Sequence, residues 1–191
     1  MKAINIDLEY TRSTLLELLQ TPSPTGMTDQ VVQLCCHKLA ELGIEYELTR
    51  RGAIRATLPG TVHSPDRAIA AHLDTLGIMV KNLKPNGRLE VVPVGTWPAR
   101  SAEGARVSLY ADHGHHFRGT VLPLKASGHV YNEGVDEQPA NWQNLELRLD
   151  QPVHSVSDLK ALGINPGDFV AVDPQPELLE NGFWVSRFLD D

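Results

Sequence analysis

The sequence has few cysteines and no long hydrophobic run, and both absences narrow what the protein can be. Its only two cysteines, Cys35 and Cys36, are adjacent. Neighbouring cysteines rarely bridge each other, so we expect no disulfide framework of the kind that small secreted domains use. No run of about 18 apolar residues occurs, which predicts no transmembrane helix. The N-terminal residues lack the apolar core of a secretory signal, and a cytoplasmic location is the simplest interpretation.

Positive charge is also scarce. The chain has 17 Lys and Arg against 24 Asp and Glu, a formal net charge of −7. Nucleic-acid binding needs a basic surface, and anionic membranes attract basic segments, so we expect neither as a partner. The glycines do not fall into the spacing of a Walker loop or of a dinucleotide fingerprint, which excludes these two types of phosphate site.

The first third of the chain predicts helices followed by strands. Apolar residues recur at helical spacing over 5–20 and 28–42, and strand-like runs follow at 44–50, 53–58 and 67–72. The last run is apolar at successive positions, which is typical of a strand buried on both faces of a sheet. Helices combined with such a strand indicate a three-layer α/β domain.

The pattern changes after Gly77. Asn86-Gly87 lies between two strand-like runs and predicts a hairpin. A short helix is expected near 156–162, with Ser155 as its N-cap. Further strand-like runs are Ala105 to Tyr110, Gly119 to Leu124, Leu145 to Leu149 and Asp168 to Val172. Residues 78–176 therefore predict a β-rich module, a small barrel or sandwich.

His72 and Asp74 are the leading candidates for chemistry. They follow the predicted buried strand, and ligands bind at the carboxyl ends of strands in open α/β sheets. Imidazole and carboxylate two residues apart can face one site and suit a zinc-type metal. The alternative is a purely structural role, in which Asp74 holds a turn at the strand end.

A dense histidine cluster at 113–116 has a simpler explanation. Its imidazoles could bind metal, but Gly114 and the flanking Asp112 favour a solvent-exposed hairpin turn. His129 and the Asn132-Glu133 pair are interpreted as ordinary residues of the β-rich module, with a loop near an active site as the alternative.

Two other polar sites have mainly structural explanations. Ser23 lies in a rigid loop, 21–26, and no glycine elbow flanks it, so a pocket-lining loop is favoured over a nucleophile. Asp190 and Asp191 alone would suggest a solvated tail. The apolar residues over 183–189 argue against a floppy end, because they prefer burial, and predict a strand or strand-to-helix segment returning to a core.

A set of motifs, taken in chain order, resembles one known family. They are Pro22-Ser23-Pro24-Thr25-Gly26, Ala71-His72-Leu73-Asp74-Thr75-Leu76-Gly77, Glu103-Gly104-Ala105-Arg106-Val107, Gly163-Ile164-Asn165-Pro166-Gly167-Asp168 and Arg187-Phe188-Leu189-Asp190-Asp191. Together they resemble the glutamyl-aminopeptidase and tetrahedral-aminopeptidase family of co-catalytic di-metal peptidases. Lys125-Ala126-Ser127-Gly128-His129 and Asp173-Pro174-Gln175-Pro176 are similar to the branch linked to the osmoprotectant N-acetylglutaminylglutamine amide.

The resemblance implies roles for three residues. His72 would bind the first metal, Asp74 would orient that histidine, and Asp190 would bridge two metal ions. The implied cofactors are two divalent ions, zinc or alternatively cobalt. The implied partners are a short peptide or peptide-amide substrate and further copies of the chain in a homo-oligomer.

The resemblance also implies a domain organisation. Residues 1–77 would be the N-terminal part of a three-layer α/β metallopeptidase domain, 78–176 a β-rich, barrel-like insert for oligomerisation and access, and 177–191 an incomplete return to the catalytic domain. The family's Glu-Glu pair, a further acidic ligand and a distal histidine have no counterpart here. We therefore expect a truncated aminopeptidase chain that is inactive alone, with partial or no metal occupancy. The alternative is a non-catalytic oligomerisation or binding module.

Overall fold

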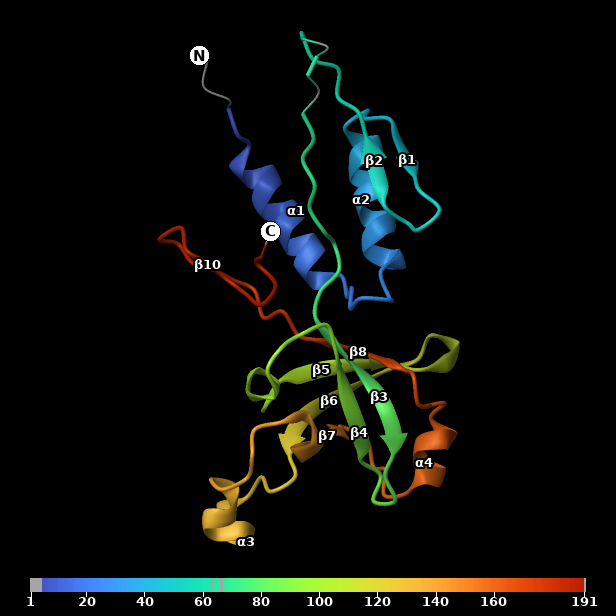
Figure 1. The fold of residues 1–191 in the computed structure, drawn as a ribbon, viewed down its shortest axis with the longest axis vertical. Helices are drawn as coiled ribbons and strands as arrows, with labels where there is room; N and C mark the ends of the chain where they lie inside the picture. Colours follow the sequence, from blue (N-terminus) through green and yellow to red (C-terminus); the bar gives the residue numbers. More distant parts are fainter. Residues whose placement is uncertain (1–4, 63, 66, 191) are drawn as a thin grey trace. The chain divides into compact units, whose positions relative to one another are not determined.

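The computed structural model describes residues 5–62, 64–65 and 67–190, which form two compact units (Figure 1). One unit joins Met1–Asp74 to Pro174–Asp191, and the other is the continuous segment Thr75–Asp173. The second unit is thus inserted into the chain of the first. No helix among the described residues is both long and apolar enough to cross a membrane.

The inserted unit is built on a closed barrel of six antiparallel strands, in the order β3-β4-β7-β6-β5-β8. The strands are β3 (Gly77–Leu83), β4 (Leu89–Val94), β5 (Arg106–Tyr110), β6 (His116–Pro123), β7 (Leu145–Leu149) and β8 (Phe169–Val172). Alternate residues face inward, as the two-residue period of a strand requires. Leu109 and Leu147, for example, are fully buried. This confirms the predicted β-rich module and identifies it as a barrel.

Turns and short helices connect the strands. Gly87 has a φ of 77° in the β3–β4 hairpin, which confirms the turn predicted from Asn86-Gly87. Ser155 accepts a hydrogen bond from the Asp158 backbone nitrogen and caps α4 (Val156–Ala161), as predicted. The other short helices are η1 (Ala99–Ser101), η2 (Asp112–Gly114), α3 (Gly128–Tyr131), η3 (Asn132–Val135) and η4 (Trp142–Asn144). In Figure 1, α3 lies at the tip of a long connection between β6 and β7.

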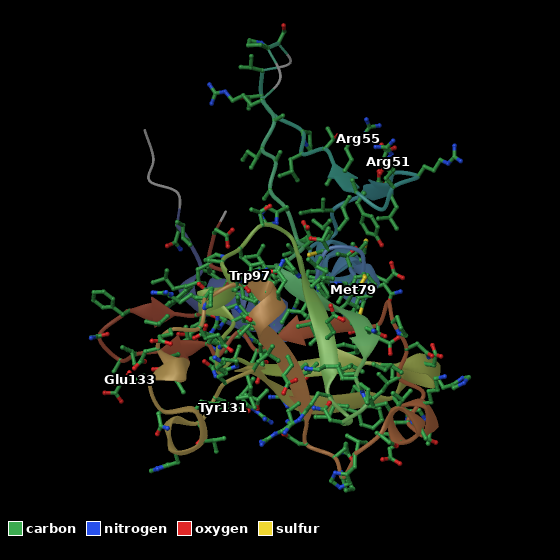
Figure 2. All side chains as sticks on the ribbon, turned by 60° about the horizontal axis from the view of Figure 1, so that its bottom comes forward. Arg51, Arg55, Met79, Trp97, Tyr131 and Glu133 are labelled. Atoms are coloured by element: carbon green, nitrogen blue, oxygen red, sulfur yellow. The ribbon has the colours of Figure 1, made fainter. Side chains whose placement is uncertain are left out.

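The other unit contains two helices and two small hairpins. Both predicted helices are confirmed as α1 (Leu8–Gln20) and α2 (Asp29–Glu41). An ion pair joins them, with Lys38 Nζ 3.0 Å from Glu17 Oε1. The hairpins pair β1 (Tyr46–Leu48) with β2 (Ile54–Ala56), and β9 (Glu177–Leu178) with β10 (Trp184–Val185). Arg51 and Arg55 of the first hairpin extend away from the ribbon (Figure 2).

The prediction of a buried strand at 67–72 is wrong. These residues form no strand, and Ile69 is fully exposed. A buried strand needs neighbours on both edges and helices on both faces, whereas β1 and β2 pair only with each other among the described residues. The described residues of this unit therefore include helices and two-stranded sheets, but not the central sheet of a three-layer domain.

The C-terminal segment matches its prediction only in part. The expected strand is present as the short β10, but its apolar neighbours are not buried. Phe183 is 67% exposed and Leu189 is 44% exposed, so the predicted return to a core is not found. A hydrophobic sequence indicates a preference for burial, but burial also requires a partner surface.

Candidate metal site

His72 and Asp74 lie together, as the sequence predicted. His72 Nδ1 is 2.8 Å from the Asp74 carbonyl oxygen and 3.3 Å from the carboxylate oxygen Oδ1. A carbonyl oxygen can only accept, so Nδ1 must carry the hydrogen of this contact. In the neutral ring, Nε2 is then the nitrogen with the lone pair that a metal would take. The two side chains are 47% and 37% exposed, so ions and small ligands can reach them from solvent.

A third residue, Thr25, completes this arrangement. Its hydroxyl Oγ1 donates to the Asp74 carboxylate oxygen Oδ2 at 2.6 Å. The sequence predicts only a rigid, pocket-lining loop around Thr25. Forty-nine positions separate Thr25 from Asp74, so no local pattern indicates the contact. The neighbouring Ser23 is only 2% exposed, which agrees with the prediction that it is not a nucleophile.

Asp190 is exposed and lies beyond β10, while Asp191 falls outside the described residues. Within residues 5–62, 64–65 and 67–190, no group of three or more His, Cys, Asp or Glu side chains could hold a metal ion. The donor types nevertheless suit zinc, and histidine ligands of metals commonly donate their other N–H to a carboxylate or carbonyl oxygen. His72 and Asp74 thus fit one ligand and its orienting partner rather than a full coordination sphere.

The sequence profile of the M42 glutamyl aminopeptidase family matches residues 52–191. The chain belongs to this family. It is 40% identical over 181 residues to a Bacillus subtilis (strain 168) protein named "Putative aminopeptidase YhfE", covering 95% of this chain and 52% of that protein. The chain thus spans about half the length of this curated relative.

Solved structures show the same fold for this M42 chain. The TET aminopeptidase from the marine sediment archaeon Thaumarchaeota archaeon SCGC AB-539-E09 matches with a TM-score of 0.76 and 18% identity, over 91% of this chain and 47% of that one. The Pyrococcus horikoshii TET1 peptidase matches with a TM-score of 0.74 and 18% identity, over 94% of this chain and 52% of that one. That peptidase is described as able to assemble into a tetrahedron or a large octahedral shell. These likenesses agree with an M42 α/β chain carrying a barrel.

The histidine cluster of this M42 chain forms the predicted hairpin turn. Asp112–Gly114 connects β5 to β6, and His113 has a φ of 59°. His116 stacks on Tyr110 with ring centroids 6.2 Å apart, and His115 stacks on Phe117 at 6.5 Å. These contacts give two of the three imidazoles a packing role. His129 and Glu133 lie on the exposed connection between β6 and β7, as expected of ordinary residues of the module.

The two cysteines lie on α2. Cys36 is buried and Cys35 is half-buried, as is typical of small residues in or near a core. Burial raises the pKa of the Cys35 thiol, and the neighbouring Cys36 raises it further. Because the thiolate is the reactive form, both effects lower the reactivity of Cys35.

Proposed function

We propose that this chain forms part of a metal-dependent aminopeptidase that removes N-terminal residues from short peptides or hydrolyses small peptide amides. Membership of the M42 family supports the reaction type. The observation that carries the proposal is the His72–Asp74 pair, in which Asp74 keeps a hydrogen on Nδ1 and leaves Nε2 as the metal-binding nitrogen.

Three residues have assigned roles in this proposal. His72 would hold one of two divalent ions, zinc or alternatively cobalt, and Asp190 would act as the carboxylate ligand shared by the two. Asp74 orients the His72 ring. When bound, the ions supply Lewis-acid chemistry, polarising the peptide carbonyl and lowering the pKa of a water molecule.

The described residues alone are expected to be inactive. They contain no cluster of three or more potential metal ligands, and a co-catalytic site needs ligands from several strands. Partial or no metal occupancy is therefore proposed for the 191-residue chain. The association with the osmoprotectant system and the cytoplasmic location also stay predictions.

The barrel unit is proposed to serve oligomerisation and to shape access to the active site. From the sequence, we propose that this role belongs to residues 78–176, between a catalytic part at 1–77 and a return segment at 177–191. The likeness to a TET1 peptidase that assembles into shells supports a homo-oligomer. The second candidate function is a non-catalytic oligomerisation or binding module. The barrel favours it, because it holds nearly all buried hydrophobic residues of the described chain.

The test combines elemental analysis for zinc with an aminopeptidase assay on the 191-residue chain. We expect well below two zinc ions per chain, further loss of zinc in His72→Ala, and unchanged zinc in His113→Ala, which alters an exposed histidine of the hairpin turn. Zinc binding that survives His72→Ala would remove His72 from the site. Full loading with peptidase activity would contradict the expected inactivity.

A further inference from the structure

Thr25 lies in a turn that is anchored by buried neighbours. The Met27 backbone nitrogen donates to the Pro24 carbonyl at 2.8 Å, and Gly26 has a φ of 98°. A positive φ at the third position is the mark of a type II turn, which favours glycine there. Pro24 is fully buried and Ser23 is 2% exposed. The backbone of Thr25 is therefore fixed on both sides while its side chain remains at the surface.

The Thr25 hydroxyl and the His72 ring contact the same carboxylate through different oxygens. Thr25 Oγ1 lies 2.6 Å from Asp74 Oδ2, and His72 Nδ1 lies 3.3 Å from Asp74 Oδ1. The torsion that turns a carboxylate has a broad, shallow profile, so a free Asp74 would sample many orientations. A hydrogen bond to one oxygen sets the plane of the group and thereby the direction of the other oxygen.

The hydrogen on His72 Nδ1 needs this support. In water, neutral imidazole favours the tautomer protonated at Nε2, which would block that nitrogen from a metal. The Asp74 carbonyl and carboxylate oxygens both face Nδ1, at 2.8 and 3.3 Å, and favour the opposite tautomer. An Asp74 carboxylate that turned away would remove one of these two acceptors from Nδ1.

We propose that Thr25 is a positioning residue whose hydroxyl fixes the Asp74 carboxylate and so keeps His72 protonated at Nδ1. This inference rests on the proposed function only for the consequence that Nε2 then meets a metal. The tautomer itself is a property of the metal-free chain. A role for the hydroxyl, rather than for the size of the side chain, requires that serine replace Thr25 and that valine fail to do so.

The test is the tautomer of His72, measured from the ¹⁵N shifts of its ring nitrogens by long-range ¹H–¹⁵N NMR in the metal-free 191-residue chain. We expect Nδ1–H in wild type and in Thr25→Ser, and a shift toward Nε2–H in Thr25→Val. Thr25→Ala repeats the comparison if the valine methyl disturbs the turn. Thr21→Val is the matched control, because the Thr21 hydroxyl donates to the Glu17 carbonyl at 2.7 Å and has no part in holding Asp74.

Zinc affinity, measured by calorimetry on the same variants, gives the second readout. Loss of a group that orients a metal-binding histidine weakens binding about 10- to 100-fold, so Thr25→Val should weaken zinc binding while Thr25→Ser and Thr21→Val do not. Unchanged ring shifts in both Thr25→Val and Thr25→Ala would overturn the positioning role. A tautomer shift without zinc binding by any variant would uphold it, because the tautomer does not depend on a bound metal.

Discussion

At the scale of single residues, two arginines form ion pairs between neighbouring segments on the outer face of the barrel. Arg118 donates through Nη1 to Asp173 Oδ1 at 2.7 Å and to Ser108 Oγ at 2.6 Å, and Nη2 contacts the other Asp173 oxygen. Arg106 reaches Asp150 and Thr120 in the same manner. Forked contacts of this kind are the stronger form of an ion pair. Because both pairs are partly exposed, each is expected to contribute only about 0–1 kcal/mol.

The pair of Arg106 and Asp150 predicts a pH-dependent contribution to stability. The hydrogen bond from Arg106 lowers the pKa of Asp150 below the ordinary value of 3.8. A lowered pKa in the folded state stabilises the protein above the unfolded-state pKa, and this stabilisation is lost as the pH falls through the folded-state pKa. Arg106→Gln should therefore lower the free energy of unfolding at pH 7, and the difference from wild type should shrink below about pH 4.

Urea unfolding from pH 7 to pH 3 measures this difference. Arg100→Gln, which changes an exposed arginine on η1, should show no such convergence with pH. A constant gap between wild type and Arg106→Gln across the whole range would mean that the arginine acts through packing of its stem and not through Asp150.

The candidate site shows what a sequence can predict at this scale. His72 and Asp74 are two positions apart, and their side chains meet within one extended segment. Thr25 joins them from a different part of the chain, through a contact that exists only after folding. The sequence therefore predicts the pair, while the third member depends on tertiary structure.

At the scale of elements, Gly119 allows β6 and β7 to pack closely. A Cβ atom at this position would lie 2.6 Å from the Arg148 carbonyl oxygen and 2.8 Å from Leu147 Cδ1. Gly119→Ala should therefore force these strands apart and lower the free energy of unfolding by about 1–3 kcal/mol. Gly128→Ala is the matched control, because a Cβ there meets nothing within 4 Å. The midpoint of urea unfolding is measured for both variants. Equal midpoints would show that the strands adjust to a Cβ atom at Gly119 without loss of stability.

The barrel strands were predictable because their signals are local. Alternation of buried and exposed residues is visible within β5 and β7, and glycine turns mark the hairpin between β3 and β4. The segment 67–72 has an equally apolar sequence, yet it forms no strand among the described residues. Burial of such a segment depends on neighbours that local sequence does not specify, and the prediction failed for this reason.

At the scale of the whole molecule, the hydrophobic core is unevenly distributed between the two units. Val31 and Cys36 are the only buried hydrophobic residues outside the barrel unit, apart from Pro24, among those the structure describes. The barrel unit encloses a continuous set that includes Ile78, Leu109 and Val170. Regions with few buried apolar contacts open at low free-energy cost, so the two units should differ in local stability.

Amide hydrogen exchange on the 191-residue chain tests this difference directly. We expect slow exchange in β5, because it hydrogen-bonds to β6 on one side and to β8 on the other. The hairpin of β1 and β2 has one partner per strand and exposed residues throughout β1, so it should exchange close to the rate of an unfolded peptide. Residues 67–72 should exchange as fast, since they form no strand. Equal protection of β5 and 67–72 would contradict the expected difference in local stability. It would require hydrogen-bonded partners for residues 67–72, supplied for instance by a second copy of the chain.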